Sequence, residues 1–201
     1  MMGELTFFLG LQVKQMKDGI FISQTKYSRD LMKKFDMDQT RYTSLIGSLF
    51  YLTTSRPNIT FIVGVCSRFQ FVPKDSHMIG AKRIIRYLKG CQEVGLWYPK
   101  EGGFNLIGYS DSDYAGCRVD KKSTPGTCQI LGNRLVSWFR KKQNSIATST
   151  AEAKYIVASS CCAQVLWVRQ QLRDYEIEQK EISIMCDNTS AIEITQNPVL
   201  H

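Results

Sequence analysis

Four acidic residues in the second half of the sequence stand where carboxylates could do chemistry together. They lie at the ends of predicted strands or at the start of a predicted helix, and they are Asp111, Asp113, Glu152 and Asp187. Hydrolysis of a phosphodiester at neutral pH needs a deprotonated water and a stabilised leaving oxygen, which two Mg²⁺ ions about 4 Å apart can supply. Mg²⁺ prefers a few carboxylates and the substrate phosphate as ligands. The pattern therefore favours a metal-dependent site on one rim of a sheet.

Each of these residues also has a purely structural interpretation. The run from Ser149 to Glu152 matches a capping box, in which Ser149 caps a helix and Glu152 reaches back to the chain before it. Asp187 could cap the helix that is predicted after Asn188. Asp111 and Asp113 could shape a turn. At the level of residue types and spacing, both interpretations remain open.

The elements that must position these residues follow from hydrophobic periodicity. In the second half we expect a three-strand meander, one long helix, a buried strand and a short helix that ends near Asn197. These elements cover residues 104–110, 124–131, 134–140, 150–173, 182–186 and 189–197. Gly132-Asn133 joins the second and third strands. The acidic residues fall at the boundaries of this order of elements.

The first half reads as a short hairpin followed by helices. Two strands over 5–14 and 20–23 flank an Asp-Gly turn, and helices are expected over 25–36, 42–55 and 76–89. The apolar stretch over 59–70 is expected to be helical or buried. In the helix over 76–89, Ile79, Ile84 and Leu88 are expected to face the core. The remaining faces carry basic side chains, namely Lys82, Arg83, Arg86 and Lys89, and Gly90 is expected to cap the C-terminus.

Charge divides the chain in the same way. Residues 1–100 contain 15 Lys and Arg against 7 Asp and Glu, whereas residues 101–201 contain 11 of each, so the net charge of +8 lies entirely in the first half. A basic half beside a neutral half indicates a part that contacts a polyanion and a part that uses its own carboxylates; a solvated basic surface is the simpler alternative. We expect two domains, 1–100 and 101–201, with the boundary near Lys100-Glu101-Gly102-Gly103, where the glycine pair and the shift in charge coincide.

Composition rules out a membrane span and argues against a secreted protein and a zinc protein. No apolar run approaches the roughly 20 residues that cross a bilayer, and the first residues lack the basic start of a secretory signal. Seven cysteines without a CxxC motif, beside two histidines, predict reduced and mostly buried thiols rather than a zinc site. We therefore expect an intracellular protein, cytoplasmic or nuclear, without a membrane partner; the sequence gives no oligomeric state.

Two strings in the second half carry a family resemblance. GYSDSDYAGCRVDKKSTPGTCQILGNRLVSWFRKKQNSIATSTAEAKYIVAS and IMCDNTSAI closely resemble the ribonuclease H domain of copia-type retrotransposon Pol polyproteins. Upstream, FFLGLQVKQMKDGIFISQTKYSRDLMKKF resembles the end of the reverse transcriptase region of the same polyproteins. YTSLIGSLFYLTTSRPNI and AKRIIRYLKG resemble the segment that leads into ribonuclease H. The resemblance covers almost the whole chain.

The resemblance implies a fold and an activity. The fold would be α/β: a ribonuclease H-like mixed sheet, flanked by helices, whose first three strands are antiparallel. A mainly helical reverse transcriptase remnant with a short hairpin would precede it. Asp111, Glu152 and Asp187 would be the first, second and third metal-binding and catalytic carboxylates, holding two Mg²⁺ ions, or Mn²⁺. The substrate would be the RNA of an RNA–DNA hybrid. Lys141 and Lys142, after the third strand, could touch a phosphate backbone or lie in a solvated loop.

The sequence also departs from the family. No Tyr-x-Asp-Asp polymerase motif occurs, so we expect no DNA synthesis. Residues 37–41 join two segments that the family separates by some tens of residues, which indicates an internal deletion. The family continues past His201 with a further strand and a fourth acidic ligand. Lys154 stands where the family usually has Glu. Because it lies two residues after Glu152, we expect it to point elsewhere on the helix and to matter little.

Three functions remain open after the sequence. The chain could be a hybrid-cleaving nuclease that uses the three carboxylates. It could be a non-catalytic remnant that binds nucleic acid through the basic helix over 76–89. It could also be a relic that folds poorly because its sheet is incomplete.

Overall fold

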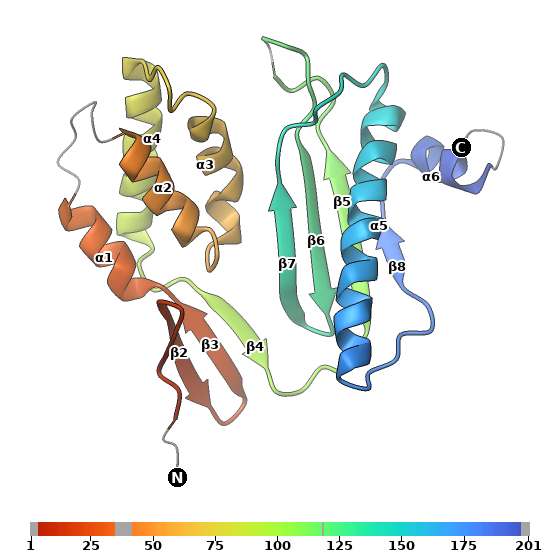
Figure 1. Ribbon diagram of the computed structural model, residues 1–201, viewed down its shortest axis with the longest axis horizontal. Coiled ribbons are helices and arrows are strands. Elements are labelled where there is room, and N and C mark those ends of the chain that lie inside the picture. The colour runs from red at the N-terminus through yellow and green to blue at the C-terminus, as the bar shows by residue number, and fades with distance from the viewer. Residues whose placement is uncertain (1–3, 35–41, 118, 198–201) are drawn as a thin grey trace. The chain divides into compact units, whose positions relative to one another are not determined.

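The computed structural model describes residues 4–34, 42–117 and 119–197 of the chain. It divides into two compact units, Met1–Glu101 and Gly102–His201, each of which is described by itself (Figure 1). Both units combine a sheet with helices, so the expected α/β class is confirmed. The division falls between Glu101 and Gly102, and it is followed by two glycines, Gly102 and Gly103, with positive φ angles of 125° and 65°. The deletion expected at residues 37–41 lies outside the described residues.

Unit 1 pairs an antiparallel sheet with a group of helices (Figure 1). The sheet has the order β1-β2-β3-β4, with bounds Phe7–Phe8, Leu11–Met16, Gly19–Ser23 and Leu96–Pro99. The helices are α1 (Thr25–Lys34), α2 (Tyr42–Leu52), α3 (Thr60–Ser67) and α4 (Asp75–Gly90), and a short 3₁₀ turn, η2 (Pro57–Ile59), precedes α3. Their apolar faces form one core, which includes Leu31, Ile46, Leu49, Val63, Ile84 and Leu88.

The hairpin of unit 1 differs in two respects from the sequence-based expectation. The strand expected over 5–14 is broken at Leu9 and Gly10, whose φ angles of 47° and 79° create the turn between β1 and β2. A side chain at Gly10 would lie 1.9 Å from the Tyr51 hydroxyl, which donates a hydrogen bond to the Leu9 carbonyl over 2.8 Å. The expected elements also do not include β4, which pairs with β3 from Gly19↔Pro99 to Ile22↔Leu96.

Other expectations for buried positions also need correction. Ile79 is 51% exposed rather than in the core, because it lies on the basic face of α4. Gly90 is the last residue of α4, and Cys91 is the cap. All seven cysteines are free as expected, but only Cys66 and Cys161 are buried, so the thiols are not mostly buried.

Unit 2 contains a four-stranded mixed sheet in the order β7-β6-β5-β8. The strands are β5 (Leu106–Ser112), β6 (Pro125–Leu131), β7 (Arg134–Arg140) and β8 (Ser183–Met185). β5, β6 and β7 are antiparallel neighbours, as the predicted meander requires, whereas β8 runs parallel to β5. The helices are α5 (Thr150–Asp174) and α6 (Thr189–Gln196). The predicted order of elements in this half is therefore confirmed. The strand expected to be buried over 182–186 is not, because Ser183 and Met185 of β8 are exposed and only Ile184 is partly buried.

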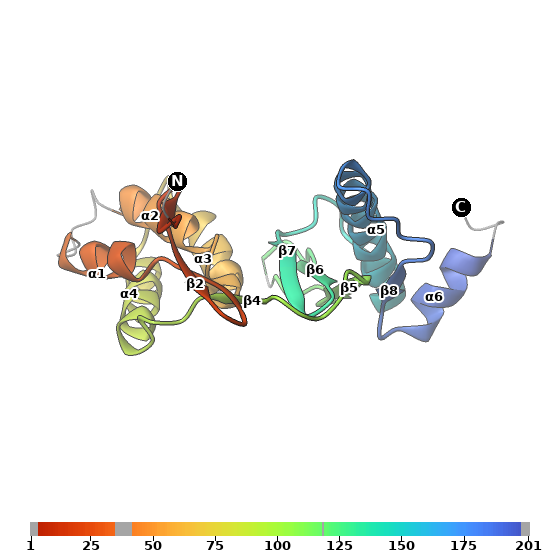
Figure 2. The same cartoon turned by 90° about the horizontal axis from the view of Figure 1, so that it is seen from below.

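Helix α5 packs against β5 and β6 and positions the rest of the unit (Figure 2). Its buried residues Cys161, Val165, Val168 and Leu172 form a core cluster with Leu106 of β5. The helix approaches β5 closely because Gly108 has no side chain: a Cβ there would lie 2.9 Å from both Cys161 Sγ and a Val165 methyl carbon. Within the described residues, no helix has the length and apolar character needed to cross a membrane.

Candidate functional site

Two of the predicted site residues lie at the same edge of the unit 2 sheet. β5 and β8 are parallel neighbours, with Tyr109 opposite Met185. Asp111 is the residue before the last of β5, and Asp187 follows the end of β8 by two residues. Because parallel neighbours end on the same edge, the two carboxylates come together there. Both side chains face solvent, with exposed fractions of 75% for Asp111 and 67% for Asp187.

Lys154 of α5 lies between these two carboxylates. Its Nζ atom is 3.3 Å from Asp111 Oδ1 and forms an ion pair with Asp187 Oδ1. The Lys154 side chain is only 12% exposed, whereas both of its carboxylate partners are mostly exposed. Lys154 thus points elsewhere on the helix than Glu152, as expected, and its ammonium group contacts the other two predicted site carboxylates.

Helical geometry explains why Lys154 faces the sheet. Each residue of an α-helix turns the chain by about 100°, so positions 7, 11 and 18 residues apart share a face. Lys154 shares its face with Cys161, Val165 and Leu172, all of which are buried against the sheet. Glu152, two positions earlier, is turned by about 200° and lies on nearly the opposite side. This spacing is visible in the sequence and predicts that Lys154 faces the sheet. Matching residues to a family motif does not by itself reveal it.

Glu152 is engaged at the N-terminus of α5. Its carboxylate accepts hydrogen bonds from the Thr148 backbone N–H, over 2.6 Å, and from the Thr148 hydroxyl. The Glu152 N–H donates to Ser149 Oγ over 3.1 Å, so Ser149 is the cap of the helix. These are the contacts of the capping interpretation, with the carboxylate reaching one residue further back than a standard capping box. A metal-ligand role for Glu152 stays a prediction that requires its carboxylate to leave Thr148.

The site does not fit a magnesium centre in this arrangement. Among the described residues, no three His, Cys, Asp or Glu side chains come close enough together to hold a metal ion. The two aspartates that do share an edge face an ammonium group instead. An ammonium donates hydrogen bonds to carboxylates, whereas Mg²⁺ needs a near-octahedral set of oxygen ligands at about 2.1 Å. The position that a cation would occupy between Asp111 and Asp187 is therefore taken by Lys154.

Electrostatics keep the ion pairs charged at neutral pH. The hydrogen bond from Lys154 is the main cause that lowers the pKa of Asp187 below its usual value. The hydrogen bond to Asp187 is likewise the main cause that raises the pKa of Lys154, against the opposing effect of burial. At Glu152, hydrogen bonds from the Thr148 side chain and backbone lower the pKa of the carboxylate. All three groups therefore remain ionised at neutral pH.

Asp113 has a structural role in the turn that follows β5. Its Oδ1 atom accepts a hydrogen bond from the Thr124 backbone N–H. A Cβ at Gly116 would lie 2.2 Å from Asp113 Oδ2, so the turn closes tightly around this carboxylate. Of the two neighbouring aspartates, Asp111 is thus the one that faces Lys154, and Asp113 holds the loop.

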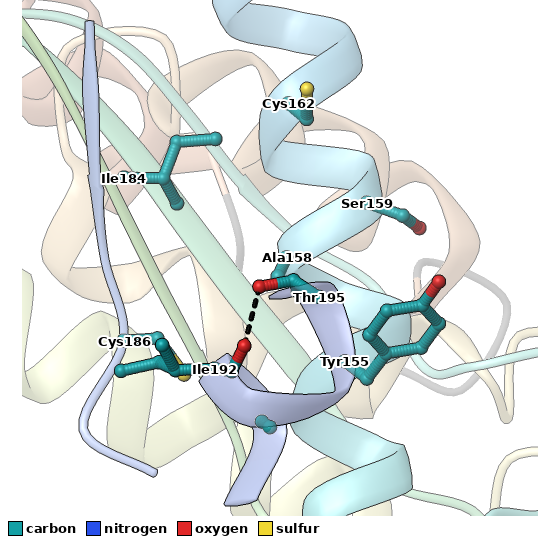
Figure 3. A pocket seen from close by; sticks show the side chains of 9 residues that line it. Tyr155, Ala158, Ser159, Cys162, Ile184, Cys186, Ile192 and Thr195 are labelled. Atoms are coloured by element: carbon teal, nitrogen blue, oxygen red, sulfur yellow. Dashed lines mark hydrogen bonds between the residues drawn. The ribbon is translucent and has the colours of Figure 1, made fainter. Parts of the chain in front are cut away.

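A pocket of about 400 Å³ lies beside the site, between α5, β8 and α6 (Figure 3). Its lining includes Tyr155 and Cys186, the chain neighbours of Lys154 and Asp187. The other lining residues are Ala158, Ser159, Cys162, Ile184, Ala191, Ile192 and Thr195. Thr195 Oγ1 uses its hydrogen bond within α6, donating to the Ile192 carbonyl over 2.6 Å. No acidic or basic side chain of the described residues lines this pocket.

Comparison with curated proteins identifies the family. The chain is 32% identical, over 98% of its length, to the retrovirus-related Pol polyprotein from transposon RE1 of Arabidopsis thaliana. It is 36% identical, over 84% of its length, to the corresponding polyprotein from transposon TNT 1-94 of Nicotiana tabacum. The chain belongs to the copia-type retrovirus-related Pol polyproteins. It spans about 15% and 13% of these two relatives, respectively.

Other comparisons give further results. A Plasmopara viticola protein named secreted RxLR effector protein 161 is 36% identical over 68% of the chain, which covers 97% of that protein. No family model matches the chain, and no solved structure matches it. The alignment to RE1 extends over 224 residues, more than the 201 of this chain, so the Pol polyprotein of RE1 has residues in this region that the chain lacks. An internal deletion would leave this pattern.

The basic residues of this Pol segment have different surroundings in the two units. Lys82, Arg83, Arg86 and Lys89 are all exposed on α4. Lys141, after β7, is exposed as well. Lys142 forms an ion pair with Asp120 and lies 3.8 Å from Cys117 Sγ, which ties the end of β7 to the loop after β5. The ammonium of Lys142 is thus engaged within the unit, whereas the basic groups of α4 face solvent.

Proposed function

We propose that this Pol segment binds nucleic acid of the RNA–DNA hybrid class without hydrolysing it. In this proposal, unit 2 is a ribonuclease H-type domain whose carboxylate site holds a lysine, and unit 1 is a reverse transcriptase remnant that contributes a basic surface. The observation that carries the proposal is the contact of the Lys154 ammonium with both Asp111 and Asp187.

The topology of unit 2 supports a ribonuclease H-type fold. A meander of three antiparallel strands is followed by a long helix and then by a strand parallel to the first strand of the meander. This order of strands agrees with the one that the family resemblance implies. The resemblance also assigns metal-binding roles to Asp111 and Asp187, which lie at the carboxyl ends of two neighbouring strands.

The absence of hydrolysis follows from charge and space at this edge. Two-metal hydrolysis needs carboxylates that can bind cations and a cation that polarises water. An ammonium group between Asp111 and Asp187 contacts the Oδ1 atom of each carboxylate, and its positive charge repels a divalent ion. Lysine is also a poor base for water activation here, because its pKa is raised and it stays protonated at neutral pH.

Nucleic-acid binding is supported by the exposed basic face of α4. Lys82, Arg86 and Lys89 follow one another at intervals of four and three residues, so they lie on one stripe of the helix. Arg83 lies beside that stripe. Such a row can neutralise successive phosphates of a polyanion, independently of its sequence.

A labelled RNA–DNA hybrid tests the proposal directly. We expect the 201-residue protein to bind the hybrid and to leave its RNA strand intact with either Mg²⁺ or Mn²⁺. An Asp111→Asn variant, purified in parallel, controls for contaminating nucleases. Metal-dependent cleavage by the natural protein that disappears in Asp111→Asn would refute the non-catalytic function.

That outcome would instead support a second candidate, the hybrid-cleaving nuclease. One observation favours it: Asp111 and Asp187 share an edge of the sheet, where two carboxylates of a metal site would lie. The nuclease would require Lys154 to leave both aspartates and Glu152 to leave Thr148 when metal and substrate bind.

A further inference from the structure

We propose that Lys154 takes the structural place of a bound cation in this chain, and that position 154, rather than 152, is the third corner of the site. This inference rests on the proposed function, because it explains why the site does not hydrolyse. Beyond the proposed function, Lys154 holds the two carboxylates together, and the residue at position 154 decides whether the site binds a metal.

The two carboxylates at this edge of the unit 2 sheet are stabilised by a positive charge between them. Asp111 and Asp187 end on the same edge of adjacent strands, and like charges that share a site destabilise each other. A cation between them removes this repulsion. Lys154 provides it from within the chain, with an ammonium that contacts both carboxylates.

The Lys154 side chain is mostly buried. A long basic side chain that is 12% exposed loses most of its hydration, which is unfavourable unless its charge is paired. Lys154 is paired twice, and it lies on the face of α5 that carries Cys161 and Val165 against the sheet. The side chain is thus built into the unit and is not a solvated surface lysine.

The face of α5 that points toward the sheet also favours position 154 over position 152. The face of α5 that contains residue 154 is the face that packs on β5, whereas the carboxylate of Glu152 is bonded to Thr148 ahead of the helix. A carboxylate at position 154 would begin from the same backbone position as Lys154 and would therefore be directed at Asp111 and Asp187. With glutamate there, the edge would carry three carboxylates, the kind of oxygen-rich set that Mg²⁺ and Mn²⁺ bind.

The test measures Mn²⁺ binding by electron paramagnetic resonance and by the melting temperature of the full 201-residue protein. For the natural protein we expect no bound Mn²⁺ at this edge and a shift below about 1 °C. The Lys154→Glu variant should melt lower than the natural protein without metal, and Mn²⁺ at about 100 times its Kd should raise its melting temperature by at least 5 °C or so.

Two further variants separate the roles of residues 152 and 154. Adding Glu152→Gln to Lys154→Glu should leave the Mn²⁺-induced shift unchanged, whereas adding Asp187→Asn should abolish it. Disappearance of the shift with Glu152→Gln would show that position 152 is the corner, and the inference would then be wrong.

A Lys154→Met variant keeps the test decisive if Lys154→Glu fails to fold. It retains the aliphatic length and removes the charge, so Asp111 and Asp187 face each other without a cation. We expect Lys154→Met to bind Mn²⁺ at least tenfold more tightly than the natural protein. Equal Mn²⁺ affinity of the two proteins would overturn the inference. Because these readouts follow metal binding, they are independent of the cleavage assay that tests the proposed function.

Discussion

At the scale of single residues, the contacts of Lys154 decide how the carboxylates of unit 2 are interpreted. The family resemblance implies a metal-binding role for Glu152 from its position in the sequence motif. The structure shows that Glu152 accepts bonds from Thr148 and that Lys154 reaches Asp111 and Asp187. A positively charged residue thus stands at the position of α5 that faces the two carboxylates.

The ion pairs predict a defined pH dependence. The pKa of Asp187 is lowered from 3.8, so its contribution to stability is present above about pH 4 and is lost as the pH falls through the folded value. The pKa of Lys154 is raised from 10.5, so its contribution is present below that value and is lost as the pH rises through the folded one. The stability difference between the natural protein and Lys154→Met should therefore be largest between about pH 5 and 10.

Urea unfolding across this pH range checks the prediction. In a Trp97→Phe background, the fluorescence reports Trp138 and Trp167, the two tryptophans of unit 2. The two proteins should converge in stability at both ends of the range. A difference that stays constant from about pH 3 to pH 12 would show that Lys154 stabilises the unit through packing alone.

At the scale of elements, capping and residue spacing are sufficient to predict where α5 begins and which of its faces is buried. Its start at Ser149 follows from the capping pattern, and the structure confirms Ser149 as the cap. Its sheet-facing side follows from spacing as well, since Cys161, Val165 and Leu172 are all buried. Applying the same spacing backwards from Cys161 reaches Lys154, so the sequence contains enough information to find this residue.

The cap makes a quantitative prediction for α5. Ser149→Ala removes the acceptor of the Glu152 N–H, and it should lower the free energy of unfolding of unit 2 by about 1 kcal/mol. Ser159→Ala is the matched control, because Ser159 is exposed inside the same helix and only donates to the Ile156 carbonyl. The control should change stability by less than about 0.5 kcal/mol. Equal effects of the two substitutions in urea unfolding would contradict the role of the cap.

Other elements could not be found from local pattern. β4 has only four residues and ends at Pro99, so its strand signal, from Trp97 and Tyr98, is short, and it pairs with the edge that β3 offers. The strand expected over 5–14 is interrupted by the fit of Gly10 against Tyr51, a contact between residues 41 positions apart. Both outcomes depend on tertiary contacts, which override local propensity.

At the scale of the whole molecule, the two units have different chemical characters. The net charge of +8 belongs to the first hundred residues, and the exposed basic row on α4 agrees with the prediction from sequence, apart from Ile79. The neutral unit uses carboxylates in ion pairs with Lys154 and Lys142. Nucleic-acid binding by the full chain should therefore depend mainly on unit 1.

Reversing charges tests that dependence. Changing Lys82, Arg83, Arg86 and Lys89 to Glu should weaken hybrid binding and reduce the salt dependence, by up to about 0.9 in the log–log slope for each phosphate that the variant no longer neutralises. A control variant changes four other exposed basic residues to Glu, with the same change of net charge: Lys14, Lys17, Arg173 and Lys180. Equal decreases of affinity in the two variants would mean that net charge, rather than the face of α4, attracts the nucleic acid.

The antiparallel pairing of β3 with β4 has a consequence for the length of the chain between them. Because Gly19 lies opposite Pro99, the helices of unit 1 form one large loop whose two ends the strand pair closes. The entropy of closing such a loop grows only with the logarithm of its length, about 0.6 kcal/mol for each doubling. Removing some tens of residues between two helices therefore changes the closure entropy by less than about 1 kcal/mol. The strand pair can tolerate such a deletion, since the ends of the loop stay where the sheet holds them.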